Sequence, residues 1–280
     1  MNVSQQQLNK IANQTRRDIV RMVHAVQSGH PGGSLGCTEI LVYLFNNYLK
    51  YRIPNHQNGE GEDVFILSNG HISPVFYSVL ARVGFFELDE LNTFRKLNSR
   101  LQGHPAVKEK LPGVRVATGS LGQGLSVGIG IAEGKKLNND NRQTVVLMGD
   151  GELQEGQCWE AIMYAGHNKL HKLLAIVDFN GQQIDGATKE IMGFNELKSK
   201  FASFAWETYE MDGNSFEEIH RTFEEQKSSD GNKPRVIIMK TEMGNGVDFM
   251  MGSHKWHGIA PNDEQLEQAL QQNPETLGDY

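Results

Sequence analysis

Two residues in glycine-containing loops have side chains suited to binding a divalent metal ion. Asp150 lies in the run Gly149-Asp150-Gly151, and Asn180 lies thirty residues further along the chain. A carboxylate and an amide oxygen are hard ligands that suit Mg²⁺ or Ca²⁺ and leave most of the coordination shell to water or phosphate oxygens. The turn after Asn180 would add a third protein ligand through a backbone carbonyl, at Gln182. Gly149 and Gly151 would let the backbone approach a diphosphate closely.

The segments around these residues predict a strand–helix–strand unit. Residues 144–148 and 173–177 are apolar and contain β-branched side chains, which is typical of buried strands. Between them, apolar residues recur at helical spacing. Strands connected in this way are parallel and end at the same edge of a sheet, where open α/β proteins bind ligands. Gly-Asp-Gly by itself is ordinary turn chemistry, but this placement favours a binding site that contains both Asp150 and Asn180.

Four loop histidines are candidates for such a site. His30 is held between a glycine and a proline, and His104 also precedes a proline. His71 follows a third apolar strand, at residues 64–67, and should therefore lie at the same sheet edge. His257 lies in a long glycine-rich loop after another strand. A lone loop histidine such as His30 is more often solvated than functional, and His71 could instead cap the helix that follows it. Imidazole nevertheless titrates in the range that is useful for proton transfer.

Short sequence motifs (words), taken in order, resemble those of the amino-terminal, diphosphate-binding section of transketolase. The resemblance extends from about residue 12 to about residue 261. Its words are SGHPGG (28–33), SNGH (68–71), GHP (103–105), GSLGQG (119–124), the GDG run with its later asparagine, and HKWHG (254–258). The resemblance implies thiamine diphosphate with Mg²⁺ or Ca²⁺ as cofactors. It also implies transfer of a two-carbon ketol unit from a ketose phosphate to an aldose phosphate.

The resemblance assigns roles to individual residues of this chain. His30 would lie over the reactive carbon of the cofactor, and His104 would line the substrate channel. His257 would reach the diphosphate and take part in proton transfer, although His254 is an alternative for that place. Glu155 would lie at a dimer interface beside the other active site; its alternative role is a first-turn acid favoured by the helix dipole. The other cofactor contacts would come from His71, Gly119, Ser120, Leu121, Gly149, Asp150, Gly151, Glu152 and Asn180.

A glycine-rich segment follows the GSLGQG word. Ser120 stands where full-length transketolases usually have proline, which indicates a variant branch of the family. The helix expected next contains glycine at positions 124, 128, 130 and 134. Each glycine inside a helix costs about 1 kcal/mol relative to alanine. A flexible linker is not favoured, because apolar residues recur between the glycines, so we expect close approach of another backbone or of a ligand.

We expect residues 1–280 to form a single diphosphate-binding domain of transketolase type. Its fold class is α/β, with a doubly wound, mostly parallel sheet and helices on both faces (the thiamine diphosphate-binding fold). The strands are expected at 64–67, 144–148, 173–177, 206–209 and 236–239. The helices are expected at about 5–28, 38–49, 74–83, 89–97, 124–134, 159–170, 196–204 and after 215. The loops are expected at 29–36, 54–62, 101–114 and 241–261.

The resemblance also predicts a partner chain. The pyrimidine-binding and carboxyl-terminal domains of transketolase have no counterpart among these words, and in the family a glutamate of the pyrimidine-binding domain activates the cofactor. We therefore expect one half of a split transketolase, active with a second polypeptide that carries those domains. The two-chain units would assemble further into a dimer of heterodimers. The sugar phosphate donor and acceptor are not specified by this half.

Composition excludes several other classes of protein. The net charge is −7 and no basic stripe is present, so nucleic acid is not expected as a partner. No run of eighteen apolar residues occurs and the first residues lack the pattern of a signal peptide, so neither a membrane span nor secretion is expected. The two cysteines, Cys37 and Cys158, fall on apolar helical faces, which favours buried thiols in a reducing cytoplasm.

Three interpretations of function remain open at this point. The first is the split transketolase subunit. The second is a related thiamine diphosphate enzyme subunit, similar to deoxyxylulose phosphate synthase or to a 2-oxoacid dehydrogenase; the SGHPG and GHP words favour transketolase over these. The third is a cofactor-binding subunit without turnover, against which intact Asp150, Asn180, His30 and His71 argue.

Overall fold

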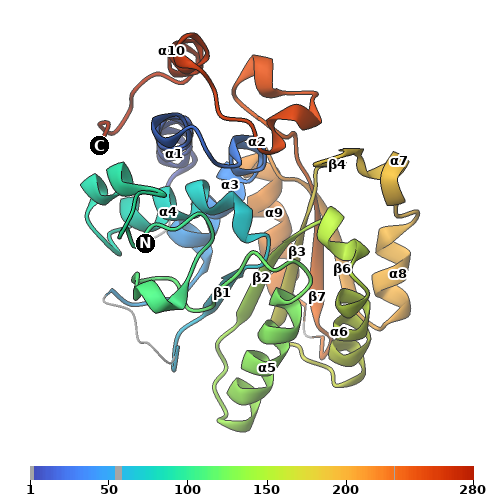
Figure 1. The fold of residues 1–280 in the computed structure, drawn as a ribbon. Helices are drawn as coiled ribbons and strands as arrows, with labels where there is room; N and C mark the ends of the chain where they lie inside the picture. Colours follow the sequence, from blue (N-terminus) through green and yellow to red (C-terminus); the bar gives the residue numbers. More distant parts are fainter. Residues whose placement is uncertain (1–2, 54–58, 230) are drawn as a thin grey trace.

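A parallel sheet forms the centre of the molecule (Figure 1). In the computed structural model, which describes residues 3–53, 59–229 and 231–280, this sheet has five strands in the order β1-β2-β3-β7-β6. All neighbouring pairs are parallel, and the register pairs Gly149 with Asp178 at the carboxyl ends of β2 and β3. The strands are β1 (Val64–Leu67), β2 (Thr144–Gly149), β3 (Leu173–Phe179), β6 (Glu207–Asp212) and β7 (Arg235–Lys240).

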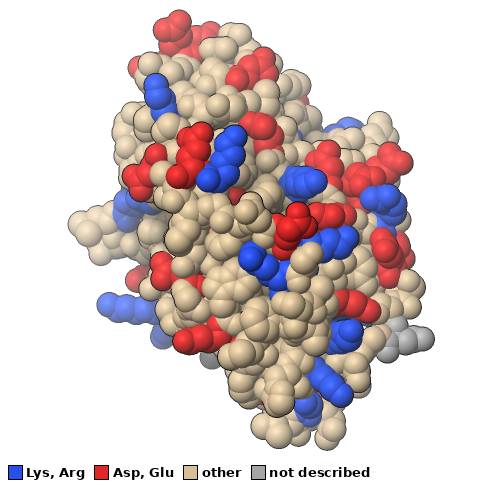
Figure 2. Space-filling model, turned by 90° about the vertical axis from the view of Figure 1, so that its right-hand side faces the viewer, with Lys and Arg blue, Asp and Glu red and all other residues tan. Residues whose placement is uncertain are grey.

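Helices cover both faces of the sheet, as the doubly wound prediction requires. One face carries α1 (Gln5–Val26), α3 (Thr38–Tyr43), α4 (Ser73–Arg82) and α9 (Phe216–Lys227). The other face carries α5 (Gly124–Leu137), α6 (Gly156–His167) and α8 (Leu197–Ser203). Figure 2 views the side of α6 to α8, where positive and negative side chains are interspersed. None of the described helices is both long enough and apolar enough to span a membrane.

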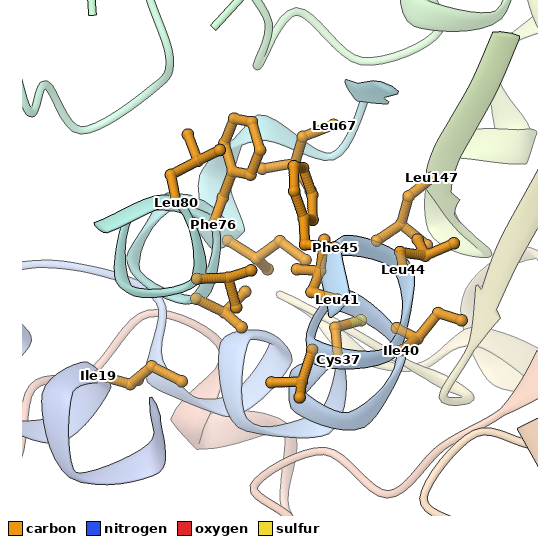
Figure 3. Packing of buried hydrophobic residues seen from close by; sticks show 14 of the residues in the cluster. Ile19, Cys37, Ile40, Leu41, Leu44, Phe45, Leu67, Phe76, Leu80 and Leu147 are labelled. Atoms are coloured by element: carbon orange, nitrogen blue, oxygen red, sulfur yellow. The ribbon is translucent and has the colours of Figure 1, made fainter. Parts of the chain in front are cut away.

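Alternation along the strands divides the core into two clusters. Leu147 of β2 packs with the α1, α3 and α4 side, whereas its neighbours Val146 and Met148 pack with the α5 and α6 side. This follows from the two-residue period of a strand, whose faces are both covered here. Figure 3 shows the first cluster, where Leu67 and Leu147 of the sheet meet Leu44 and Phe45.

The structure differs from the sequence prediction in four helical regions. The predicted loop 29–36 contains a short helix, α2, that starts at Pro31, whose fixed φ suits the first helical position. The predicted helix 38–49 continues beyond α3 as a π-helical turn. The predicted helix 89–97 is only a 3₁₀ segment that ends at Thr93, and Arg95, two residues later, has a positive φ of 55° that does not continue a helix. Helix α10 was not predicted; it begins after Asn262, which forms a capping box with Gln265.

The remaining elements are short and lie mostly in loops. The surface loop predicted at 54–62 falls mainly outside the described residues. The shorter elements are α2 (Pro31–Gly36), η1 (Leu44–Tyr48), η2 (Gly70–Ile72), η3 (Leu88–Thr93), η4 (Val107–Glu109), η5 (Gly151–Gln154), β4 (Gln182–Gln183), β5 (Gly186–Ala187), α7 (Thr188–Met192), η6 (Asp248–Met250), η7 (His254–His257) and α10 (Asp263–Gln272).

Candidate active site

A cavity of about 390 Å³ lies at the carboxyl edge of the sheet. Its wall comes from the loops that follow β1, β2, β3 and β7, together with α2 and the segments around His104 and Gly119. Ser120 and His254, although both are described, are not part of that wall. The other predicted site residues line the cavity: His30, His71, His104, Gly119, Leu121, Gly149, Asp150, Gly151, Glu152, Glu155, Asn180, Gln182 and His257.

Asp150 joins the two loops that the sequence predicted to meet. Its Oδ1 accepts a hydrogen bond from the backbone N of Gly151 at 2.7 Å. Its Oδ2 accepts from the backbone N of Gly181 at 2.8 Å and from Thr188 Oγ1 at 3.2 Å. Burial and, after it, the nearby Asp178 carboxylate raise the pKa of Asp150 to about 7. A divalent cation at this position would neutralise that charge, so the environment suits a metal ligand.

Asn180 is held by a second buried carboxylate, Asp178. The Nδ2 group of Asn180 donates to Asp178 Oδ2 at 2.9 Å, which fixes the amide so that Oδ1 accepts from the backbone N of Gln182 at 2.9 Å. Thr241 Oγ1 donates to the other oxygen of Asp178. Burial raises the pKa of Asp178 as well. The sequence prediction missed Asp178, although an acidic residue at the end of an apolar strand was a usable signal.

The ligand chemistry of this edge fits a hard metal ion bound partly by other oxygens. Within the described part of the chain, no group of three or more His, Cys, Asp or Glu side chains has the arrangement of a metal site. A metal here would therefore depend on Asp150, the amide oxygen of Asn180 and a backbone carbonyl. The Gly181 carbonyl is already used, because it accepts from Thr188 N at 2.9 Å. The carbonyl of Gln182 is thus the better candidate in this turn.

Glycines leave room beside Asp150 and bring two loops into contact. A Cβ added to Gly149 would meet no atom closer than 4.0 Å, and one added to Gly151 would come no closer than 3.6 Å to another atom. Both glycines line the cavity, so the space that their side chains would occupy is open to a ligand. Gly70 is different: a Cβ there would lie 2.6 Å from the backbone N of Gly119, which itself has a φ of +109°.

Four imidazole rings gather in the wall of the same cavity. The ring centroids of His30 and His71 are 5.1 Å apart, and those of His71 and His257 are also 5.1 Å apart. His104 is 6.4 Å from His30. Burial lowers the pKa of all four rings and is the main reason why that of His30 is about 4. The rings are therefore neutral at pH 7, and each can accept a proton or donate an N–H.

Two polar atoms in this wall have no hydrogen-bond partner among the described residues. They are Nδ1 of His30 and Oδ1 of Asn69, both of which are buried. Buried polar atoms are almost always paired, so these two atoms mark a part of the wall where the described chain leaves hydrogen bonds unmade. The sequence prediction included Asn69 only as part of a word and did not assign it to the site. It also missed other wall residues, including Gly33, Gln154, Gln183, Ile184 and Met243.

The two glutamates that follow β2, Glu152 and Glu155, have different positions in the site. Glu152 is buried, and its carboxylate accepts hydrogen bonds from Ser68 Oγ, from Gly122 N at 3.0 Å and from Gly149 N at 3.2 Å. These hydrogen bonds tie three loops of the cavity wall together through one buried carboxylate. Glu155 is exposed at the cavity edge, and no hydrogen bond or ion pair of its side chain is formed within the described part of the chain.

The low pKa of His30 predicts that acid destabilises the folded chain. Because its folded pKa is about 4 and its ordinary value is 6.5, the unfolded chain takes up the proton first, and stability falls as the pH decreases from 6.5 to 4. The loss corresponds to at most about 3 kcal/mol. We expect His30→Gln to lose less unfolding free energy than the wild type over this interval, as measured by urea unfolding. His167→Gln, at an exposed position, should lose as much as the wild type; equal losses in all three proteins would contradict the prediction.

Comparison with known proteins agrees with this geometry. Residues 7–275 match the family model described as the thiamine diphosphate binding domain of transketolase. The chain belongs to the transketolase family. It is 37% identical to one subunit of the apulose-4-phosphate transketolase of Phocaeicola vulgatus, over 95% of this chain and 93% of that protein. It is 34% identical to the 6-deoxy-6-sulfo-D-fructose transketolase subunit of a Clostridium species, over 96% and 97% respectively.

Longer transketolases match over less than half of their length. Human transketolase is 36% identical over 95% of this chain, which spans 42% of that protein. The crystal structure of transketolase from Campylobacter jejuni superposes with a TM-score of 0.87 and 34% identity, covering 98% of this chain and 43% of the other. The fold is therefore that of the transketolase diphosphate-binding section, and the relatives favour the first of the three interpretations of function.

Proposed function

We propose that this chain is the diphosphate-binding subunit of a two-subunit transketolase. The observation that carries this proposal is the convergence of Asp150 and Asn180 with four neutral histidines in one cavity. The reaction is transfer of a two-carbon ketol unit from a ketose phosphate to an aldose phosphate. Bound thiamine diphosphate supplies the carbon nucleophile and electron sink for this exchange, and the chain supplies binding and proton transfer.

The metal and diphosphate would be held at the ends of β2 and β3. Mg²⁺ or Ca²⁺ would be bound by Asp150, by Asn180 and by the Gln182 carbonyl, with diphosphate oxygens completing its shell. The backbone at Gly149 and Gly151 lines the same space and would lie against the diphosphate. Glu152 would keep this loop in place, because its carboxylate is bonded to the neighbouring loops.

The histidines would act at the diphosphate and at the substrate. His71 and His257 lie side by side and would donate hydrogen bonds to diphosphate oxygens; His257 fits this role better than His254, which lies outside the cavity wall. His30 and His104 would hold or move protons at substrate hydroxyl and carbonyl oxygens. Gly119 and Leu121 would contact the cofactor from the facing loop. Ser120, which was also expected to contact the cofactor, belongs to that loop but does not line the cavity.

A partner chain would complete the site. Relatives of the same length are named as subunits, and full-length transketolases have more than half of their residues beyond the matched section. The partner would carry the pyrimidine-binding domain with the carboxylate that activates the cofactor, and also the carboxyl-terminal domain. Ile184, which is 65% exposed at the cavity wall, offers an apolar contact for such a partner or for the cofactor ring. We expect the complex to be cytoplasmic, because both cysteines are free and buried.

A second interface would join two such pairs into a dimer of heterodimers. The outer side of α5 and α6 exposes Val127, Met163 and Tyr164, which are 39%, 54% and 48% exposed. On α5, a Cβ added to Gly130 or Gly134 would meet no atom within 4 Å. Figure 2 shows a largely uncharged area low on this side. Exposed apolar side chains beside helix glycines support close packing of another helix there, next to Glu155.

The helix glycines give a test of this second interface. The double substitution Gly130→Ala and Gly134→Ala should stabilise the isolated chain by about 1–2 kcal/mol, because alanine is the better helix residue. In the reconstituted complex, the same change should lower the fraction of the four-chain species, measured by analytical ultracentrifugation. Glu225→Ala, an exposed change on α9, is the control and should leave assembly unchanged. Undisturbed four-chain assembly in the double variant would remove the support that these glycines give to the interface.

The proposed function is tested by reconstitution of activity. The pure chain is mixed with a candidate partner that carries the pyrimidine-binding domain, and ketol transfer between sugar phosphates is measured. We expect turnover only in the mixture, and only with thiamine diphosphate and a divalent metal. Full activity of the chain alone would refute the partner requirement. Cofactor binding without turnover, for a partner that binds the chain stably, would favour the non-catalytic role instead.

A further inference from the structure

Arg95 occupies an unusual place behind the histidines. Its backbone has a φ of 55°, a left-handed conformation that arginine rarely adopts. Its N–H donates to the carbonyl of Leu101 at 2.8 Å, which closes the loop between them. The 3₁₀ segment found within the predicted helix 89–97 ends at Thr93, two residues before Arg95. The loop therefore holds Arg95 in a strained conformation, and its side chain points to the segments of two cavity histidines.

The guanidinium of Arg95 contacts two separate segments of the cavity wall. Its Nη1 donates to Ser28 Oγ at 2.9 Å, two residues before His30. It also lies close against Gly103: a Cβ added there would be 2.7 Å from the Arg95 Cζ. Gly103 directly precedes His104. One planar group thus joins the segment of His30 to the segment of His104.

The charge of Arg95 is not compensated by an acid. Arg16, Arg17 and Arg82 each form an ion pair with a carboxylate, but none of the described carboxylates pairs with Arg95. Its Nε is buried without a hydrogen-bond partner in the described part of the chain. An unpaired, half-buried guanidinium costs stability. Because arginine stays protonated at any working pH, this charge is a fixed feature of the wall.

We propose that Arg95 is a positioning residue that fixes the segments of His30 and His104 relative to each other and keeps a permanent positive charge behind both rings. The inference rests on the proposed function only where it assigns substrate protons to these two histidines. The contacts and the charge themselves do not depend on the cofactor.

The charge acts on both rings together with burial. For His30, burial lowers the pKa most, and His257, Arg95 and His104 lower it further. For His104, burial is again the main cause of the lowered pKa and Arg95 the second. His71 also packs edge-on against His30. Removal of Arg95 should therefore raise both pKa values without restoring the ordinary value of 6.5.

The first experiment measures histidine titration in the full chain by NMR, with His30→Gln and His104→Gln used for assignment. Arg95→Met should raise the pKa of both rings by about half a unit to one unit, because a nearby charge is lost. Arg95→Lys keeps the charge and should raise them less. Arg100→Met removes an arginine from the same loop that is paired with Glu90, and it should change neither ring.

The second experiment uses the reconstituted complex and separates position from charge. Arg95→Met should lower kcat by about ten- to a hundredfold and move the acid limb of the kcat/KM profile to higher pH. Arg95→Lys should restore the acid limb but not kcat, since lysine lacks the planar fork. Ser28→Ala should change the titration of His30 and leave that of His104 unchanged. This variant also tests the proposal if Arg95→Met fails to fold.

Two results would overturn the proposal. One is an unchanged titration of His30 and His104 in folded Arg95→Met, or of His30 in Ser28→Ala if Arg95→Met does not fold. The other is full kcat in an Arg95→Met complex. Failure of the proposed function has a different signature. In that case the wild-type chain would bind no thiamine diphosphate, but Arg95→Met would still change the titration of His30 and His104.

Discussion

Asp150→Ala is expected to weaken binding of thiamine diphosphate with Mg²⁺ by at least about a hundredfold, since a metal ligand is lost outright. The same change removes the acceptor of Gly181 N and Thr188 Oγ1, so the loop after β3 also loses its anchor. Wild-type chain should melt at a higher temperature when cofactor and metal are added together, because a ligand that binds only the folded state stabilises it. Asp150→Ala should show almost no such increase.

Two further variants make this result specific. Asp150→Asn keeps the size of the side chain and an acceptor oxygen for the loop, so it should stay folded while binding the metal weakly. Asp185→Ala removes an exposed acid a few residues from Asn180 and should retain the wild-type increase. An Asp150→Ala chain that cofactor and metal stabilise as strongly as the wild type would show that Asp150 is not a ligand.

Gly166→Ala is expected to cost at least about 3 kcal/mol of unfolding free energy. Gly166 lies on the buried side of α6, where an added Cβ would stand 1.7 Å from the carbonyl oxygen of Phe204. That oxygen belongs to the backbone and cannot move aside as a side chain could, so α6 must shift away from the segment before β6. The shift would also strain the bond that Trp206 Nε1 makes to the Ile162 carbonyl at 2.8 Å.

Urea unfolding of the isolated chain measures this cost. Gly156→Ala is the matched control, because Gly156 starts the same helix and an added Cβ there meets nothing within 4 Å. The control should equal the wild type or exceed it slightly, by up to about 1 kcal/mol. A Gly166→Ala chain as stable as Gly156→Ala would mean that α6 does not pack against Phe204 as described.

The sheet and its ligand edge were predictable from the sequence because strand patterns and connection rules are local. The apolar segments ahead of Asp150 and Asn180 became β2 and β3, parallel and adjacent. The direction of β1 then placed His71 at the same edge. These inferences need only the spacing of hydrophobic residues and the handedness of crossover connections. Both can be recognised in short stretches of the chain.

The residues that were missed depend on contacts between distant segments. Asp178 could be recognised as the polar end of a strand, but its bond to Thr241 Oγ1 joins two strands that are far apart in sequence. Arg95 fell inside a predicted helix, and only the bond to Leu101 and the contact with Gly103 reveal its left-handed turn. The family resemblance supplied site roles for histidines that periodicity could not assign, since loop positions carry no period.

The most direct test of the central claim is a calorimetric titration of thiamine diphosphate into the chain, with and without Mg²⁺ and with and without the candidate partner. We predict metal-dependent binding, one cofactor for each copy of this chain, that becomes tighter when the partner is present. No metal-dependent binding under any of these conditions would contradict the assignment of the cavity at the ends of β2 and β3 as a diphosphate site.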